Sequence, residues 1–309
     1  MKIVVALGGR ALLKRGELMS AANQITNLEH VAATIKEAAI RHQLILTHGN
    51  VSQLGWLSLQ SEALAKEVPV LPFDALSAQT QGMLGYWLMQ ALKNVLPHRA
   101  IASLVTQVGV SMTDPAFKHP THCFGPVWDE VCAKRLMAER GWTMMFDGRY
   151  WRRVLPAPRP VQIVEIEAIR TLVDAGVLVI AGGGGGIPVV VDDGHLQGID
   201  ALIEKDETAS LLALSLKAKR LVLATDIDGV YEGWLDVEPR RITRAHPFAL
   251  MAMDFPAESM GAKVKAACDF VMNTGHEAVI GSLDDLDALV EGQAGTVVTL
   301  DCEETEYEL

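Results

Sequence analysis

The segment that decides the fold is an apolar run followed by glycines, Val177-Leu178-Val179-Ile180-Ala181 and then Gly182-Gly183-Gly184-Gly185-Gly186-Ile187-Pro188. The apolar run has the length and composition of a buried β-strand. Five consecutive glycines allow the backbone to approach a ligand closely and to present several N–H groups, as a phosphate requires. A flexible turn is the plainer alternative, and it is disfavoured because five glycines beside a core are costly to order.

This glycine run matches neither of two common nucleotide-binding motifs. Ile187 and Pro188 occupy the places of a third glycine, so no G-x-G-x-x-G register fits. The segment 189–194 is typical of a strand and a turn, whereas the dinucleotide motif needs a helix there. No Gly-Lys-Ser or Gly-Lys-Thr occurs in the chain, so a Walker A loop is excluded. An NAD-dependent dehydrogenase is therefore disfavoured.

Other short apolar runs end in the same manner, in small or polar residues. They span 3–7 before Gly8-Gly9, 44–46 before His48-Gly49-Asn50, 221–224 before Thr225-Asp226, and 278–280 before Gly281-Ser282. Segments of helical period lie between them, at 28–40, 206–216 and 259–272. This alternation predicts an open, mostly parallel, doubly wound α/β sheet. In such sheets ligands bind beyond the carboxyl ends of the strands, where these turns fall.

One segment interrupts the alternation. Residues 115–160 are rich in Pro, Trp, Arg and Gly. We interpret them as an inserted, protruding subdomain or lid on a single domain that covers 1–309.

Composition excludes several classes of protein. Half of the residues are hydrophobic, 6% are aromatic, and the formal net charge is −11, which argues against a nucleic-acid surface. The four cysteines show no paired spacing, which favours a reducing compartment. No apolar stretch reaches the length of a membrane span. These features predict a cytoplasmic protein.

Two lysines stand at expected helix starts. Lys205 precedes Asp206, which is a plausible N-cap of the expected helix at 206–216. Lys263 follows Ser259 near the start of the expected helix at 259–272. Helix N-termini combined with lysines suit a transferring phosphoryl group, because its transition state needs charge neutralisation. A single lysine is more often a solvated surface residue. Thr225 and Asp226 could hold nucleotide or magnesium, or could belong to an ordinary Asp-Gly turn.

Taken together, these segments resemble carbamate kinases of the amino-acid-kinase superfamily along nearly the whole chain. The matching landmarks occur in order at residues 4–9, 48–50, 78–86, 104–108, 114–117, 151–154, 183–188, 205–206, 259–260 and 295–296. The resemblance implies a three-layer α/β/α domain with a small protruding subdomain, a homodimer, and Mg-ATP as nucleotide. It implies transfer of a phosphoryl group between ATP and carbamate, giving ADP and carbamoyl phosphate, or the reverse.

The resemblance also implies roles for individual residues. Lys205, Asp206 and Lys263 match positions around the transferred phosphate, with the two lysines catalytic and Asp206 on the nucleotide side. Thr225 and Asp226 are expected to contact the nucleotide as well. The acceptor-side turns match Gly8, Gly9, Gly49 and Asn50, and the nucleotide-side turn matches Gly183, Gly184 and Gly185.

The chain departs from the family pattern at positions that map to the acceptor side. Gly-Gly-Asn becomes Gly8-Gly9-Arg10, and Gly-Pro after His-Gly-Asn becomes Val51-Ser52, with Trp56 following Gly55. In the insertion, Thr-Lys-Pro-Ile-Gly-Pro becomes 121–126, with His122 and Phe124. These changes predict an altered acceptor pocket.

Each change has a physical meaning. Arg10 can bind a carboxylate or phosphate through two parallel hydrogen bonds. Val51 costs strain if its position needs a positive φ. Trp56 and Phe124 would make the pocket tighter and more apolar. His122, unlike a lysine, carries a charge only in part of the physiological pH range. We therefore expect Arg10 and His122 to take part in catalysis, and Val51 and Ser52 to contact the substrate.

Three functions remain open at this point. The first is a kinase for carbamate. The second is a kinase for another small carboxylate or for a phosphomonoester. The third is a non-catalytic nucleotide-binding homologue. His119, His122 and Cys123 lack a second pair of ligands, so no protein-bound metal centre is expected.

Overall fold

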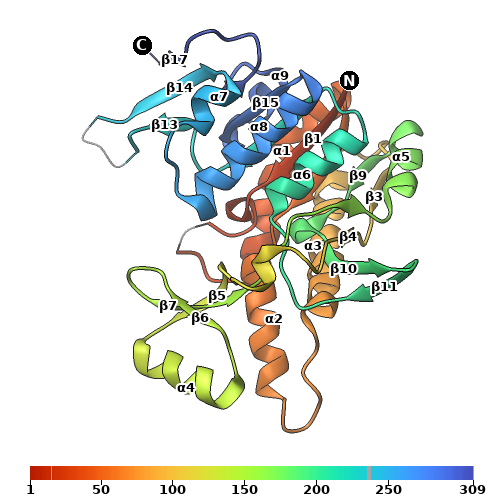
Figure 1. Cartoon of the computed structure of the whole chain (residues 1–309). Helices are drawn as coiled ribbons and strands as arrows, with labels where there is room; N and C mark the ends of the chain where they lie inside the picture. Colours follow the sequence, from red (N-terminus) through yellow and green to blue (C-terminus); the bar gives the residue numbers. More distant parts are fainter. Residues whose placement is uncertain (15, 235–237, 309) are drawn as a thin grey trace.

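A central sheet organises the fold of the computed structural model, which describes residues 1–14, 16–234 and 238–308 (Figure 1). Within these residues the strand order is β13-β14-β16-β15-β12-β1-β2-β9-β3, with β17 paired to β14. The strands are β1 Lys2–Leu7, β2 Gln43–His48, β3 Ile101–Ser103, β9 Leu178–Ile180, β12 Arg220–Thr225, β13 Val230–Glu232, β14 Arg240–Ala245, β15 Glu277–Ser282, β16 Thr296–Val298 and β17 Glu306–Tyr307.

The middle of this sheet is parallel, as the sequence predicts. β3, β9, β2, β1, β12 and β15 pair in parallel in that order. Antiparallel pairs occur beyond β15, where β16 pairs with β15 and β14 pairs with β13 and β17. The sheet is therefore mixed, with a parallel centre that brings the carboxyl ends of five predicted strands to one edge.

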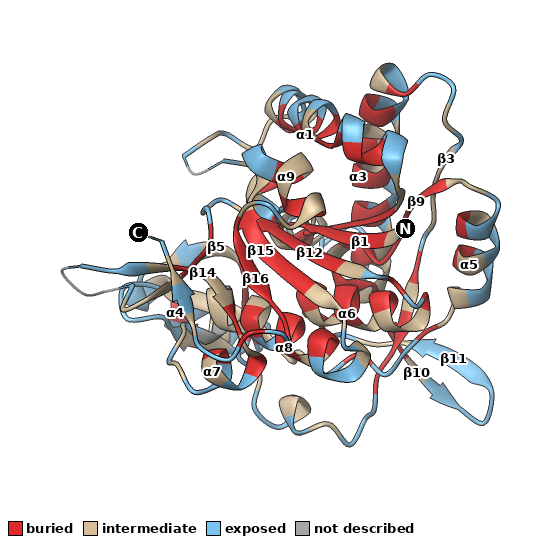
Figure 2. Cartoon of the chain, turned by 90° about the horizontal axis from the view of Figure 1, so that it is seen from above, coloured by how far each residue is buried: buried red, intermediate tan, exposed pale blue. Residues whose placement is uncertain are grey.

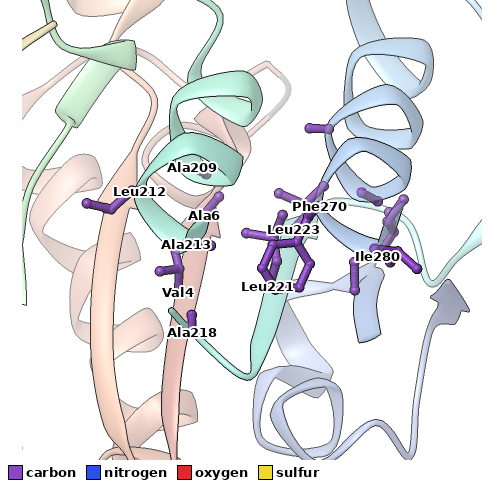
Figure 3. Close-up of a cluster of buried hydrophobic side chains, with 14 of the residues drawn as sticks. Val4, Ala6, Ala209, Leu212, Ala213, Ala218, Leu221, Leu223, Phe270 and Ile280 are labelled. Atoms are coloured by element: carbon purple, nitrogen blue, oxygen red, sulfur yellow. The ribbon is translucent and has the colours of Figure 1, made fainter. Parts of the chain in front are cut away.

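Helices cover both faces of the sheet, and this confirms the three-layer prediction (Figure 2). Ile3, Val5 and Leu7 of β1 pack in the core on the side of α1 (Ala21–Arg41), α3 (Phe73–Val95) and α9 (Leu286–Glu291). Val4 and Ala6 pack in the core on the side of α5 (Ile166–Asp174), α6 (Lys205–Ser215) and α8 (Ala262–Thr274), where they lie near Leu223 (Figure 3). Alternate side chains of a strand point to opposite faces, so a strand buried on both sides is apolar throughout.

The remaining elements complete the chain. The helices are α1 Ala21–Arg41, α2 Val51–Ala63, α3 Phe73–Val95, α4 Glu130–Arg140, α5 Ile166–Asp174, α6 Lys205–Ser215, α7 Pro247–Met251, α8 Ala262–Thr274 and α9 Leu286–Glu291. Shorter turns of helix are η1 Gly9–Ala11, η2 Pro115–Phe117, η3 Gly183–Gly185, η4 Ala257–Gly261 and η5 Leu283–Asp285. In the described residues no helix is both long and apolar enough to cross a membrane.

The glycine run leaves the central sheet and enters a second sheet. That sheet has the order β11-β10-β4-β8, with β4 Gln107–Gly109, β8 Gln162–Ile163, β10 Ile187–Asp192 and β11 His195–Gly198. The segment after the glycines is thus strand β10 and a turn, as expected, and not the helix of a dinucleotide-binding fold.

A third sheet lies within the segment that the sequence singles out. It has the order β5-β7-β6, with β5 His122–Trp128, β6 Met144–Phe146 and β7 Trp151–Leu155, and it projects with α4 beside α2 (Figure 1). A Cβ on Gly55 of α2 would lie 2.7 Å from Gly125 N, so this close approach requires glycine at position 55. Gly125 has φ +70°, a conformation that favours glycine.

Candidate active site

Two adjoining cavities lie at the carboxyl edge of the parallel strands. Cavity A has a volume of about 470 Å³ and is lined by Gly8, Gly9, Arg10, Leu13, Ser52, Thr225, Asp226, Ile227, Tyr231, Trp234, Asp254, Phe255, Pro256, Ser259, Met260 and Lys263. Cavity B has a volume of about 280 Å³ and is lined by Gly9, Gly49, Asn50, Val51, Ser52, Gln53, His122, Cys123, Arg152, Gly184, Ile203, Glu204, Lys205, Asp206, Ser259, Ala262 and Lys263. The two cavities share four wall residues, Gly9, Ser52, Ser259 and Lys263.

The predicted lysines meet at a buried carboxylate on this wall. Lys263 Nζ lies 2.8 Å from Asp206 Oδ2, and Lys205 Nζ donates to the other carboxylate oxygen, Oδ1. Lys205 and Lys263 come from the starts of α6 and α8, 58 positions apart, so the fold brings together what the sequence shows separately. Two cations share one anion here, which leaves the cluster with a net positive charge for an anionic ligand.

Burial and the charges within this cluster shift the pKa values of its three members. Burial alone would raise the pKa of Asp206, but the charges of Lys205 and Lys263 outweigh it and hold that pKa well below its usual range. Burial lowers the pKa of Lys205, and the nearby Lys263 adds to this. Burial is the largest single influence on the pKa of Lys263 and acts to lower it, but the charge and hydrogen bond of Asp206, together with the charges of Glu204 and Asp226, outweigh it, and that pKa is raised.

One expected detail of this cluster is wrong. Asp206 is not the N-cap of α6, because the helix begins at Lys205 and Glu204 is the cap. Asp206 N donates to Glu204 Oε1 over 3.3 Å. The cap therefore comes one residue before the lysine, and Asp206 lies in the first turn with its carboxylate free for both ammonium groups.

The glycine turns allow backbone segments to approach closely. A Cβ on Gly8 would lie 2.9 Å from Ala224 O, and one on Gly49 would lie 3.2 Å from Gly9 N. Gly184 has φ +68°, and a Cβ there would overlap the Asn50 side chain. These contacts explain why the turns after β1, β2 and β9 carry glycine.

The expected division into acceptor and nucleotide sides is only partly found. Gly184 and Asp206, expected on the nucleotide side, line cavity B instead of cavity A. Gly183 and Gly185 are buried and line neither cavity. Gly183 packs against His48, where a Cβ would lie 2.6 Å from the imidazole ring. Of the residues expected on the nucleotide side, Thr225 and Asp226 line cavity A.

The residues that depart from the family pattern are also divided between different places. Val51, Ser52 and His122 line cavity B, whereas Arg10 lines cavity A, with its Nη1 3.6 Å from Asp226 Oδ2. Gly8, expected on the acceptor side, likewise lines cavity A. The altered positions therefore do not form one wall.

For two of the altered positions the expected placement is wrong. Trp56 is half exposed and lines a separate groove with Leu18 and Met83. Phe124 is buried with its ring 5.2 Å from that of Phe73. Val51 is the first residue of α2 and does not have a positive φ, so the expected strain does not arise.

Sequence reasoning missed several wall residues. Glu204 Oε2 lies 4.0 Å from His122 Nδ1 across cavity B, and Arg152 lies on the same cavity wall. Arg152 belongs to the landmark 151–154, but its positive charge alone was not enough to identify it as a residue of the cavity wall. In cavity A, Tyr231 and Trp234 form an edge-on aromatic pair at 5.2 Å. Nothing in the spacing of these residues signals a pocket.

The described residues contain no group of three or more His, Cys, Asp or Glu side chains that could hold a metal ion.

His48 gives the fold a dependence on pH. It is fully buried at the end of β2, and burial, with the charge of Lys205, lowers its pKa to about 4. The unfolded chain binds a proton at this histidine below a pH of about 6.5, whereas the folded chain does not, so stability falls as pH falls from 6.5 towards 4. The linkage amounts to about 2 kcal/mol between pH 8 and pH 5.

We expect the His48→Gln variant to lose this part of the acid sensitivity. Urea unfolding at pH 8 and pH 5 measures the effect as the change in unfolding free energy between the two pH values. That change should be about 2 kcal/mol smaller in the variant than in the unmodified protein. Equal changes in the two proteins would contradict the prediction.

Comparison with known proteins identifies the family to which this fold belongs. A model of the amino acid kinase family matches residues 1–282. A carbamate kinase of Rhizobium meliloti (strain 1021) is 45% identical over 303 residues, which cover 97% of this chain and 93% of the relative. A carbamate kinase of Haemophilus influenzae is 43% identical over 309 residues, with 99% of each chain covered.

Solved structures give the same result. The carbamate kinase from Giardia lamblia bound to AMP-PNP superposes with a TM-score of 0.89 at 36% identity, covering 96% of this chain and 98% of that chain. The chain therefore belongs to the amino acid kinase family and, within it, to the carbamate kinases.

Proposed function

We propose that the chain catalyses reversible phosphoryl transfer between ATP and carbamate, which yields ADP and carbamoyl phosphate. The observation that carries this proposal is the position of Lys263, on the wall that the two cavities share and in contact with Asp206. A nucleotide in cavity A and an acceptor in cavity B would meet at this wall.

Cavity A suits the nucleotide. Its apolar side offers surface for the nucleotide base and consists of Tyr231, Trp234, Phe255 and Met260. Thr225 and Asp226 offer polar groups for the sugar and phosphates of the nucleotide. The solved relative from Giardia lamblia binds AMP-PNP, an analogue of ATP. Bound Mg²⁺ would neutralise part of the phosphate charge, and the Asp226 carboxylate is a ligand type that this ion accepts.

In the proposed step, a carbamate oxygen in cavity B attacks the γ-phosphorus of ATP. A bond forms between that oxygen and phosphorus, the bond between phosphorus and the β–γ bridging oxygen breaks, and the electron pair leaves with ADP. Lys205 and Lys263 stabilise the charge on the phosphoryl oxygens. Asp206 keeps both ammonium groups oriented, because each donates to one of its two oxygens.

We further propose that the acceptor side of cavity B is altered. Three of the altered residues, Val51, Ser52 and His122, line this cavity. Another small carboxylate is the second candidate acceptor, and the polar wall of cavity B favours it over an apolar substrate. A phosphomonoester acceptor and a nucleotide-binding homologue without activity remain the further alternatives.

Formation of ATP from ADP and carbamoyl phosphate tests both proposals. We expect turnover by the unmodified chain, and a kcat/KM for carbamoyl phosphate raised by about tenfold or more when Arg10→Asn, Val51→Gly and His122→Lys are combined. The added lysine restores a permanent cation, and the added glycine frees space in cavity B. If neither the unmodified chain nor the triple variant forms ATP although both are well folded, the carbamate kinase proposal is refuted.

Two further measurements separate the alternatives. A screen of small acids and phosphomonoesters coupled to ADP release would reveal another acceptor. Calorimetric binding of ATP without transfer to any acceptor would favour the inactive homologue.

The sheet of β5, β6 and β7 with α4 is the unit that we propose as the subdomain expected at 115–160. The homodimer and the cytoplasmic location stay predictions.

A further inference from the structure

Two consecutive arginines on β7 have different surroundings. Arg153 Nη1 donates to Glu62 Oε1 over 2.6 Å, and its guanidinium carbon lies 4.2 Å from the ring centre of Trp142. The same guanidinium also lies over the rings of Phe73 and Phe124, at 5.0 and 5.4 Å. Arg153 therefore has a complete structural role, in which it joins the third sheet to α2.

Arg152 lies on the wall of cavity B and lacks such partners. Neighbouring residues of a strand point to opposite faces, so Arg152 cannot share the aromatic surroundings of Arg153. Its one hydrogen bond to the described part of the chain runs from Nη2 to Gly125 O over a long 3.5 Å. Its Nε is buried without a partner, and no carboxylate of the described residues lies within 4 Å of it. A buried donor without a partner is costly, so the guanidinium of Arg152 would be stabilised by an anion bound in cavity B.

The other basic side chains around cavity B have partners within the described structure. Lys205 and Lys263 share Asp206, and His122 faces Glu204 at 4.0 Å. Arg152 differs from all three because no carboxylate of the described residues is paired with it, although its charge acts on Asp147 from farther away. An anionic group of a ligand would supply the missing partner.

We propose that Arg152 forms a second anion subsite of cavity B, which binds the carboxylate of the acceptor. A guanidinium can donate two parallel N–H bonds to a carboxylate, and this geometry favours a planar anion over a neutral amide. Lys205 and Lys263 then remain available to the phosphoryl group. The inference rests on the proposed function and names its substrate class, small acceptors that carry a carboxylate.

The test compares two stable ligands that differ only at the end expected to contact Arg152. Phosphonoacetate carries a carboxylate, whereas phosphonoacetamide carries a neutral amide. Calorimetry with the full chain measures the Kd of each for the unmodified protein and for Arg152→Gln, Arg152→Lys and Arg149→Gln. Arg149 is a matched control, since it is exposed on the turn before β7 and lies against the ring of Tyr150.

We expect Arg152→Gln to weaken phosphonoacetate binding by about 10- to 100-fold, the usual worth of a charge-assisted hydrogen bond, and phosphonoacetamide binding by only a few fold. Arg152→Lys should recover part of the loss, because lysine restores the charge without the two-pronged geometry. Arg149→Gln should leave both constants unchanged. In turnover assays with ATP and carbamate, Arg152→Gln should raise the KM for carbamate, which carries the carboxylate, and leave the KM for ATP unchanged.

Equal weakening of both ligands, or no weakening, would overturn the subsite. Loss of AMP-PNP binding together with that of phosphonoacetate would show that Arg152 serves only the fold, and it would overturn the subsite as well. Because the binding test needs no turnover, an unmodified protein that fails to form ATP would refute the proposed function separately.

Discussion

Replacement of Lys205 by Met is expected to lower kcat for ATP formation from ADP and carbamoyl phosphate by about 10³-fold or more. Lys205 is buried at the first position of α6, on the wall of cavity B, and donates to Asp206. A phosphoryl group in transfer spreads charge over its oxygens, and a fixed ammonium group in a site that excludes water stabilises that charge strongly. Met keeps most of the side-chain volume and removes only the cation.

Lys265→Met is the matched control for this change. Lys265 lies on α8, is exposed, lines neither cavity and pairs with Glu207. We expect its kcat to stay within about twofold of that of the unmodified protein. Steady-state rates of both variants test the prediction, and binding of AMP-PNP checks that each variant is folded. A kcat of Lys205→Met within about tenfold of the unmodified value would refute the catalytic role.

Asp206→Asn is expected to destabilise the fold by about 3–5 kcal/mol, because it leaves two buried ammonium groups without their shared anion. Asp206 is 1% exposed, and each of its oxygens accepts from one lysine. The amide keeps the shape of the carboxylate but not its charge. Urea unfolding at pH 7 measures the loss, and Asp269→Asn is a control that removes a partly exposed partner of the exposed Arg159 with an effect near zero.

The same variant makes a prediction about pH. The pKa of Asp206 is lowered in the folded chain, so its contribution is complete above the unfolded value of about 3.9 and is lost as pH falls below it. The difference in unfolding free energy between the unmodified protein and Asp206→Asn should therefore be constant from pH 5 to pH 8 and shrink below about pH 4. Equal unfolding midpoints at pH 7 would refute the role of Asp206 in the cluster.

The strand ends could be predicted because their signals are local. The runs 3–7, 44–46 and 221–224 are apolar and end in turn residues. Residues adjacent in sequence are therefore enough to predict each strand, the turn after it, and the edge of the sheet where ligands bind. The helix that begins at Lys205 was also predicted within one residue, although its cap is Glu204. The antiparallel strands beyond β15 were not predicted, since pairing direction depends on contacts between distant segments.

The placement of side chains in the site followed the sequence less well. Phe124 and Trp56 stand next to positions that face the cavities, yet one is buried in an aromatic cluster and the other lies half exposed on a separate groove. Val51 was expected to be strained, but it begins a helix. Neighbours in sequence point in different directions, and only the path of the backbone decides which of them meets a ligand.

The sequence by itself determined the glycine turns, the two lysines and the resemblance to carbamate kinases, because each depends on residue types in a fixed order. The tertiary structure alone decided that Lys205 and Lys263 share Asp206, that Gly184 belongs with Asn50 rather than with Asp226, and that Arg152 faces cavity B. These facts join segments separated by many residues. Their cause is the folding of buried strands side by side, which brings turns that are remote in the chain to one edge of the sheet.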